Sequence, residues 1–356
     1  MKLTALSGFG VKGPACFLLE IAGRRILLDL GRGPDGDALP DLTDLGRVDA
    51  LIFSHGHADH TGGLALAAAI GSPPLFAPSP TIALSPDPAL AAARPYEGLG
   101  EILGLPFASG PSGHAPGASW LRIGGAAGLV YTGDISREST LYRCTTPPPA
   151  AALVFDASYG PAEEELPAQV ESLLALSDRP LLLPAPAGGR GLEMARAFLD
   201  AGRPVALCPA HRAVARLMAE RGAWLVAGGA AALADLLART DGLSAESPAR
   251  GVMIAAGPNA ERGVAGALAP RFLAEGRARV VFTGHLAEGT PAPGWVAAGR
   301  ALFRRWNVHP ALPELRALLA AVAPRLAMPA FCPPEAARAL EAALDRPLAH
   351  NPEMIW

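Results

Sequence analysis

The chain has 356 residues, of which 50% are hydrophobic, and a formal net charge of −3 at pH 7. This length is sufficient for a sizeable core and for two or three domain-sized units. The weak negative charge excludes a chain-wide basic field, so any binding of nucleic acid would need a local groove. The lack of a long uninterrupted apolar run, and of a signal-peptide pattern after Met1, predicts a cytoplasmic protein with no membrane segment.

The first predicted elements form a β-hairpin. The apolar runs at residues 16–21 and 25–29 are separated by Ala22-Gly23. A Gly-containing turn between two short apolar runs is typical of paired antiparallel strands. The second run ends in an acidic residue, Asp29.

A cluster of histidines follows the next apolar run. Residues 51–53 are typical of the end of a buried strand, and residues from Leu64 onward are typical of a helix. Between them lie four side chains of the types that zinc prefers as ligands, namely His55, His57, Asp59 and His60. The first two can face one point and the last two a second point, which predicts two neighbouring metal sites. The alternatives are a histidine-rich surface turn or histidines that only cap the following helix.

The spacing His-x-His-x-Asp-His across residues 55–60 resembles the signature of the metallo-β-lactamase superfamily. The resemblance implies an α/β protein with the four-layer αββα metallo-β-lactamase fold and a hydrolase that uses bound metal. In that family an aspartate at the position of Asp29 supports the metal loop from behind its ligands. The alternative for Asp29 is a carboxylate that caps a turn.

Two later loops supply further ligands according to the same resemblance. His114 lies in an irregular stretch rich in Gly and Pro, where the superfamily places its third imidazole. It would complete the first metal site with His55 and His57 and leave a position for water; the alternative is a solvent-exposed loop histidine. Asp134 ends the predicted strand at residues 128–134. Its two carboxylate oxygens could each bind one ion, or it could belong to an ordinary turn.

Four longer strings narrow the resemblance to the β-CASP branch of the superfamily, whose members are RNA- and DNA-processing nucleases. They occur in the expected order at residues 131–138, 153–160, 184–193 and 281–290. The second string is similar to the acidic motif of the branch, with Asp156 as the acid. The third and fourth are similar to the segments that open and close an inserted cap domain, with His285 where tyrosine is usual.

The resemblance and the pattern between these strings define the expected domains. Predicted helices alternate with apolar runs between residues 195 and 255, which indicates a parallel α/β layer. We therefore expect a metallo-β-lactamase domain formed by residues 1–164 and 304–356. An inserted α/β, β-CASP-like cap domain is expected at residues 165–303.

The returning segment carries His309 directly before a strongly helical stretch. In β-CASP proteins a histidine before such a helix pairs with the acid of the acidic motif, so the resemblance pairs His309 with Asp156. A carboxylate beside an imidazole favours its cationic form, which a general acid requires. The alternative is a histidine that caps the helix. In this interpretation Asp59 orients or deprotonates the attacking water.

One expected ligand is absent. In the resembling nucleases a further histidine follows the next strand, whereas residues 325–331 contain none. The sequence leaves three alternatives: a second ion held weakly by Asp59, His60 and Asp134, His350 as a substitute from the tail, or a single ion. We expect two zinc ions with a weak or empty second site, and a site of His and Asp also accepts manganese or iron.

These observations lead to three hypotheses for function. The first is a nuclease-like hydrolase that cleaves phosphodiester bonds of single-stranded RNA or DNA with a metal-activated water. The second is a hydrolase of small-molecule esters, thioesters or phosphodiesters without nucleic-acid activity, which the acidic net charge and the absent ligand favour. The third is a non-catalytic binding protein with one structural metal. The intact Asp59 disfavours it, because a buried carboxylate without a cation is costly. A homodimer is compatible with the resemblance.

Overall fold

The computed structural model describes residues 1–356, and the chain divides into two compact units. The first unit contains residues 1–137, 143–163 and 309–356. The second unit contains residues 138–142 and 164–308, a range that includes the stretch 165–303 singled out above. None of the helices combines the length and the apolar character that a membrane span requires.

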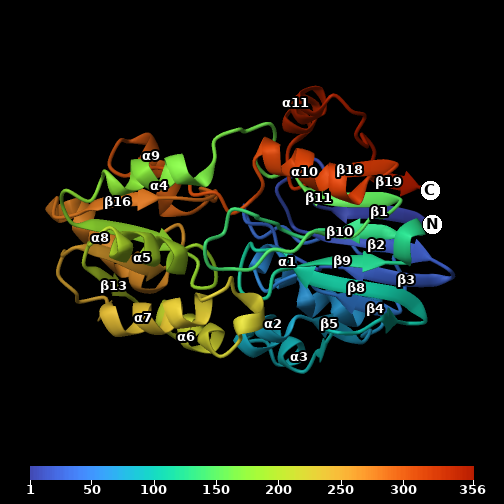
Figure 1. Ribbon diagram of the computed structural model, residues 1–356, viewed down its shortest axis with the longest axis horizontal. Helices are drawn as coiled ribbons and strands as arrows, with labels where there is room; N and C mark the ends of the chain where they lie inside the picture. Colours follow the sequence, from blue (N-terminus) through green and yellow to red (C-terminus); the bar gives the residue numbers. More distant parts are fainter. The chain divides into compact units, whose positions relative to one another are not determined.

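The first unit contains a seven-stranded sheet with the order β19-β1-β2-β3-β4-β5-β6. Its strands are β1 (Lys2–Ser7), β2 (Cys16–Ile21), β3 (Arg24–Leu28), β4 (Ala50–Ile52), β5 (Leu75–Ala77), β6 (Arg94–Pro95) and β19 (Glu353–Ile355). The predicted hairpin is confirmed as β2 and β3, which are antiparallel with Glu20 opposite Arg25. The two chain ends lie side by side because β1 pairs with β19 (Figure 1). Strands β3, β4 and β5 are parallel, so the residues after them emerge at one edge.

A second, six-stranded sheet has the order β18-β11-β10-β9-β8-β7. Its strands are β7 (Glu101–Ile102), β8 (Leu105–Pro111), β9 (Ser119–Ile123), β10 (Leu129–Tyr131), β11 (Ala152–Asp156) and β18 (Leu326–Ala330). Strands β10, β11 and β18 are parallel neighbours. Their carboxyl ends therefore present Asp134, Asp156 and Phe331 at a common edge of this sheet.

The two sheets enclose the main core of the first unit, and helices cover their outer faces. Phe17, Leu121 and Tyr131 pack together between the sheets. Helices α10 (Leu312–Val322) and α11 (Pro334–Leu344) pack on the second sheet. The first sheet carries α1 (Ala58–Thr61), the 3-10 helix η1 (Leu64–Ile70), α2 (Ser79–Leu84) and α3 (Pro88–Ala91) on its outer side. A short 3-10 turn, η2 (Gly125–Ala127), connects β9 to β10 and contacts β8. The four-layer αββα fold is confirmed (Figure 1). The helix predicted from Leu64 is a 3-10 helix that ends at the left-handed Gly71.

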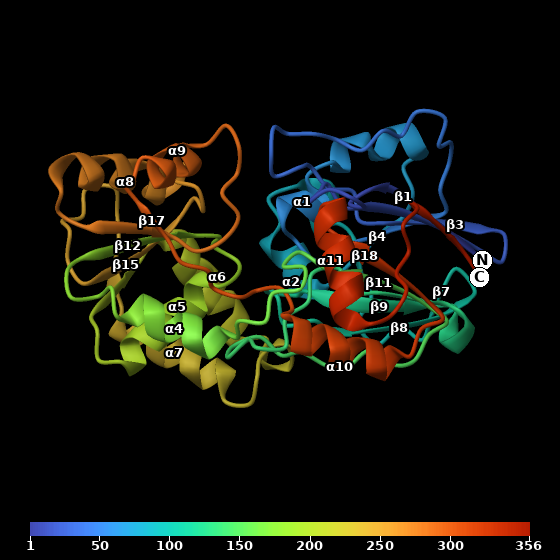
Figure 2. The same cartoon turned by 90° about the horizontal axis from the view of Figure 1, so that it is seen from above.

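The second unit is built on a six-stranded sheet with the order β14-β13-β15-β12-β16-β17. All of its strand pairs are parallel. The strands are β12 (Leu181–Ala185), β13 (Val205–Leu207), β14 (Asp241–Gly242), β15 (Val252–Ala256), β16 (Arg279–Phe282) and β17 (Leu302–Phe303). The helices are α4 (Leu166–Leu174), α5 (Gly191–Asp200), α6 (Pro209–Ala219), η3 (Gly222–Trp224), α7 (Gly229–Arg239), α8 (Gly263–Glu275) and α9 (Pro291–Ala297). Helix α8 packs on one face of the sheet and α5 on the other (Figure 2). This is the expected parallel α/β layer.

A buried carboxyl group lies inside the second unit. Glu193 of α5 is buried, and its Oε2 accepts a hydrogen bond from the backbone nitrogen of Thr140 at 3.0 Å. Burial raises the pKa of Glu193 to about 7, although hydrogen bonds from Thr140 and Ser139 lower it in part. The hydrogen bond to Thr140 also explains why residues 138–142 belong to the second unit.

We expect Glu193→Gln to raise the melting temperature by several degrees at pH 8 and by little at pH 5. The folded state holds the proton up to about pH 7, whereas the unfolded carboxyl loses it near the ordinary pKa of 4.5. The free energy of unfolding of the wild type therefore falls as the pH rises between these values, by on the order of 3 kcal/mol. Glutamine stays neutral, so the variant lacks this fall. The exposed Glu220→Gln is the control, and a shared pH dependence of all three proteins would contradict the prediction.

Candidate metal centre

The histidine loop follows β4 and is held tightly by the backbone. The chain leaves β4 at Ile52, and α1 begins at Ala58 with His57 as its N-cap. The backbone oxygen of Asp59 accepts a hydrogen bond from the nitrogen of Ala15 at 2.8 Å. A Cβ atom on Gly31 would lie 1.7 Å from the same oxygen, so only glycine fits at residue 31. The loop is therefore fixed against its neighbours before any ligand binds.

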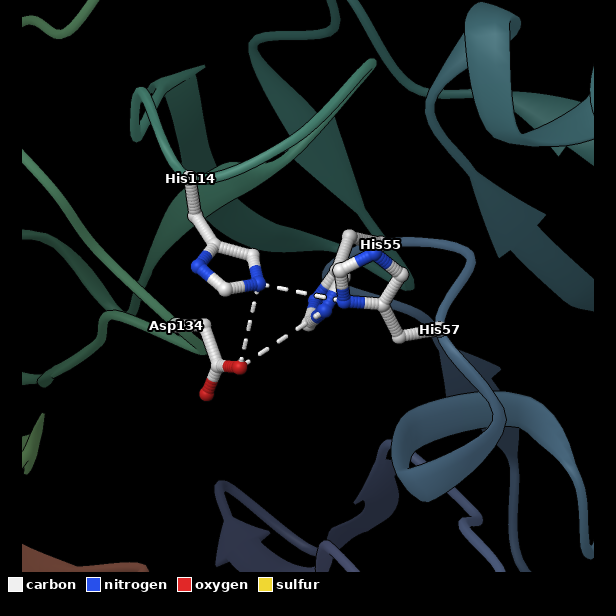
Figure 3. Close-up of side chains that lie close together, drawn as sticks. All are labelled: His55, His57, His114 and Asp134. Carbon is white, nitrogen blue, oxygen red and sulfur yellow. Dashed lines mark hydrogen bonds and ion pairs between the residues drawn. The ribbon is translucent and has the colours of Figure 1, made fainter. Parts of the chain in front are cut away.

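Three imidazoles and one carboxylate meet at a first cluster, drawn in Figure 3. Its members are His55, His57, His114 and Asp134, and their ligand atoms all lie within 4.8 Å of one another. His114 Nε2 lies 3.1 Å from His57 Nδ1 and 3.3 Å from Asp134 Oδ2. His55 Nε2 lies 3.8 Å from the same Asp134 oxygen. The loop after β8 and the loop after β10 thus bring His114 and Asp134 to the histidine loop.

Two buried atoms of this cluster have no hydrogen-bond partner. They are Nε2 of His55 and Oδ1 of Asp134, and buried polar atoms are rarely left in this state. Burial lowers the pKa of His55 well below its ordinary value, and the neighbouring imidazoles of His60 and His57 act in the same direction. His55 is therefore neutral at physiological pH, which is the form that binds a metal. These donors fit a divalent cation.

A second cluster lies beside the first and shares Asp134 with it. It consists of Asp59, His60 and Asp134. His60 Nε2 lies 3.3 Å from Oδ1 of Asp134, whereas the first cluster faces Oδ2. The two oxygens of one carboxylate therefore face different clusters, which is the arrangement that a bridging ligand requires.

Asp29 supports the second cluster through His60. Its Oδ2 lies 2.8 Å from His60 Nδ1 and accepts a hydrogen bond from the hydroxyl of Tyr131 at 2.5 Å. Ser54 also donates to Asp29, from its backbone nitrogen and its hydroxyl, at 2.7 Å in both cases. Burial lowers the pKa of His60, but Asp134 and Asp29 outweigh it and raise the pKa well above its ordinary value. Asp29 thus lies behind His60, as the resemblance implies, and its hydrogen bonds reach Ser54 and Tyr131 as well as His60.

The place of the absent ligand is taken by an aromatic residue. Phe331 follows β18, and its ring meets the His60 ring edge-on with centroids 5.3 Å apart. His350 is exposed and lies 2.7 Å from the carboxylate of Glu341 in α11. The alternative in which His350 fills the second site is therefore wrong, because the tail holds this side chain at the surface on another partner.

His309 and Asp156 form the predicted pair. His309 Nδ1 lies 2.7 Å from Asp156 Oδ2, and His309 Nδ1 is 3.8 Å from Asp134 Oδ2. Burial raises the pKa of Asp156, but the charge and the hydrogen bond of His309, together with the charge of Lys12, bring this pKa below its ordinary value. The N-cap of α10 is Ala311, so His309 does not cap the helix. The pair is placed directly beside the two clusters.

One functional group was missed by the sequence analysis. Lys12, in the loop between β1 and β2, donates a hydrogen bond from Nζ to Ser158 Oγ at 2.8 Å and lies 3.4 Å from His309 Nε2. No motif or spacing indicated it. The one available signal was composition, because Lys2 and Lys12 are the only lysines of the chain.

Comparisons with known proteins identify the domain that carries these clusters. The family model of the metallo-beta-lactamase superfamily matches residues 9–177. The chain contains a metallo-beta-lactamase domain. Membership of this superfamily implies binding of divalent metal, and the His/Asp clusters of this domain supply suitable donors.

Two curated relatives also resemble this chain. Transcription termination factor FttA of Cenarchaeum symbiosum is 28% identical over 245 residues, which cover 54% of this chain and 38% of that protein. A ribonuclease of Thermus thermophilus is 32% identical over 181 residues, which cover 42% of each chain. These relatives belong to the β-CASP branch. The chain thus spans well under half the length of each of these curated relatives.

A solved structure supports the fold over the whole chain. A protein of unknown function from Enterococcus faecalis has a TM-score of 0.56 and 16% sequence identity, with 100% of this chain and 99% of that chain covered. At this identity the likeness shows that the fold is shared and says nothing of activity. Because the whole chain is covered, the shared fold includes both the metallo-beta-lactamase domain and the unit that contains the parallel sheet.

Proposed function

We propose that the chain is a metal-dependent hydrolase that cleaves phosphodiester bonds of single-stranded RNA or DNA. The observation that carries this proposal is the His309–Asp156 pair, whose imidazole Nδ1 is 3.8 Å from the carboxylate shared by both clusters. A proton donor beside two cation-binding clusters suits displacement at phosphorus. The names of the relatives, which include a ribonuclease and a transcription termination factor, point in the same direction.

We assign the metal ligands by the two clusters. His55, His57, His114 and Asp134 would hold a first ion, and Asp59, His60 and Asp134 a second. Zinc is the preferred ion for this donor set, and manganese or iron would also fit. When bound, such ions neutralise charge that develops on the phosphate and make water a better nucleophile.

The remaining steps belong to side chains of the chain itself. Asp59 would orient the attacking water and accept its proton. The hydrogen bond from His309 Nδ1 to Asp156 leaves Nε2 as the ring atom for proton transfer. His309 would therefore deliver a proton from Nε2 to the leaving oxygen, while Asp156 positions the ring through Nδ1.

We assign the second unit as a cap domain of the β-CASP type. The strings at residues 184–193 and 281–290 meet within this unit, because Arg190 Nε donates a hydrogen bond to Thr283 Oγ1 at 2.8 Å. The side chain of Arg190 is buried, and a Cβ on Gly284 would lie 2.3 Å from its guanidinium. The two strings therefore form one local structure, as expected if they open and close a single inserted domain.

The proposal is tested by cleavage of end-labelled single strands. Metal-loaded protein is incubated with RNA and DNA oligonucleotides and with bis(4-nitrophenyl) phosphate as a generic phosphodiester. We expect cleavage that is abolished by a chelator and by His55→Ala. His55 Nε2 is a buried nitrogen without a hydrogen-bond partner, as expected of an atom that binds metal. The proposal would be contradicted if none of these substrates were cleaved, or if His55→Ala cleaved them as fast as the wild type.

The alternative is a hydrolase of small-molecule esters, thioesters or phosphodiesters. It is favoured by the acidic net charge of −3. The two functions differ in their dependence on salt, because contacts to a nucleic-acid backbone give a steep loss of affinity as salt rises. Thioester turnover together with salt-insensitive, weak oligonucleotide binding would favour the alternative.

A further inference from the structure

Lys12 lies next to the loop of the second cluster, because a Cβ on its neighbour Gly13 would lie 3.6 Å from the Cβ of Asp59. The Lys12 side chain is half-buried, and Nζ donates a hydrogen bond to Ser158 Oγ at 2.8 Å and lies 3.4 Å from His309 Nε2. These contacts come from residues that follow β11 and precede α10. The ammonium is therefore held by the elements that form the centre.

The charges that act on this ammonium are carboxylates of the centre. Burial lowers the pKa of Lys12, but Asp134, Asp156 and Asp59 outweigh it and raise the pKa above 10.5. Two of these three carboxylates, Asp59 and Asp134, are the acidic members of the second cluster. The lysine and a second metal ion would thus depend on the same negative charges.

The second cluster is also poorer in donors than the first. It has three protein ligand atoms where the first has four, and the apolar ring of Phe331 packs against His60. One of its atoms, Asp134 Oδ1, is buried without a hydrogen-bond partner and lies 3.3 Å from His60 Nε2, so this oxygen still lacks a bonding partner that a cation could supply. Lys12 and a second ion would therefore compete for the negative charge of the same carboxylates.

We propose that the Lys12 ammonium serves as a built-in cation of the second cluster, so that the chain holds one ion tightly at the first cluster and a second only weakly. This inference rests on the ligand assignment of the proposed function. Lys12 neutralises the shared carboxylates without a metal and repels a divalent ion that would use them. A phosphate-binding role for Lys12 is less favoured, because the carboxylates already compensate its charge.

The test is a metal titration that needs no substrate. Apoprotein is titrated with zinc in the presence of a chromophoric chelator, and bound zinc is counted after desalting. We expect the wild type to retain one ion, and Lys12→Met to retain two, with the second bound roughly tenfold more tightly or better than in the wild type, as is typical of coupling between bound charges. Lys12→Arg keeps the charge and should behave as the wild type. Lys2→Met is the matched control, because Lys2 is paired with Glu353 at the surface.

A second readout uses the same two lysines. In protein labelled with 13C at lysine Cε, two side-chain signals are expected, and Lys2→Arg assigns them. A large excess of zinc should shift the Lys12 signal further than the first equivalent does, because Asp59 and the second side of Asp134 are then occupied as well. Circular dichroism and retention of the first ion show that Lys12→Met is folded.

The possible outcomes separate this inference from the proposed function. Two tightly bound ions in the wild type, or equal second-ion affinity in Lys12→Met, would overturn the role of Lys12 whether or not the protein cleaves nucleic acid. Unchanged zinc binding by Lys12→Met together with lost affinity for inorganic phosphate would instead make Lys12 a phosphate-binding residue. A second ion that appears only in Lys12→Met supports the inference even if no nuclease activity is found.

Discussion

Replacing Asp134 by asparagine is expected to lower phosphodiesterase activity by roughly 10³-fold or more and to weaken metal binding at both clusters. The carboxylate faces the first cluster through Oδ2 and the second through Oδ1. Stabilisation of transition-state charge by bound ions amounts to several kcal/mol, and about 1.4 kcal/mol corresponds to a tenfold change in rate. An amide offers one neutral oxygen and cannot serve two ions in this way. Activity and zinc content of the same samples measure the effect.

The matched control for this substitution is Asp44→Asn. Asp44 is exposed and has a positive φ of 60°, which asparagine tolerates well. Burial raises the Asp134 pKa, but His60, His114 and His309 outweigh it and lower the pKa well below its ordinary value, so Asp134→Asn also removes a charge that these rings face. Circular dichroism checks that the Asp134→Asn protein is folded. A folded Asp134→Asn protein that keeps its zinc and its activity would contradict the assignment of a shared ligand.

The convergence of the centre was predicted from the family resemblance, which brought His114 and Asp134 to the histidine loop and paired Asp156 with His309. Strand ends explain the convergence in the structure. Asp29 and His55 follow parallel neighbours in one sheet, and in the other sheet Asp134 follows β10 and Asp156 ends its parallel neighbour β11. The irregular loop of His114 has no periodic pattern, so the residues alone did not place it.

Lys12 could not be predicted in this way. Its partners Ser158 and His309 lie 146 and 297 residues away in sequence, and a single lysine in a glycine-rich loop has no periodicity. The same holds for Phe331, whose contact with His60 depends on how the edges of two sheets meet. The position of His350 is likewise set by Glu341 in α11. Residues on loops acquire their role from tertiary contacts that no local pattern contains.

Substitution of His309 by glutamine is expected to slow cleavage of RNA or DNA by about 10²- to 10⁴-fold, the usual contribution of a positioned general acid. Zinc content should stay the same, because His309 is not among the assigned metal ligands and its Nδ1 is bound to Asp156 at 2.7 Å. The ligand His60 is held by Asp29 and does not depend on His309. The alkoxide that leaves a nucleic acid needs a proton, whereas 4-nitrophenolate does not. The rate with bis(4-nitrophenyl) phosphate should therefore fall much less.

The difference between the two substrates distinguishes proton donation from a structural role. A substitution that only disturbed the centre would slow both substrates equally and would lower zinc content. Asp156→Asn is expected to resemble His309→Gln in its preference for the activated substrate but with a smaller loss, because the imidazole remains and only its partner changes. Tyr159, whose ring meets the His309 ring edge-on at 5.0 Å, provides a matched control as Tyr159→Phe, which keeps the ring contact. Equal losses on both substrates with His309→Gln would show that His309 donates no proton to the leaving oxygen.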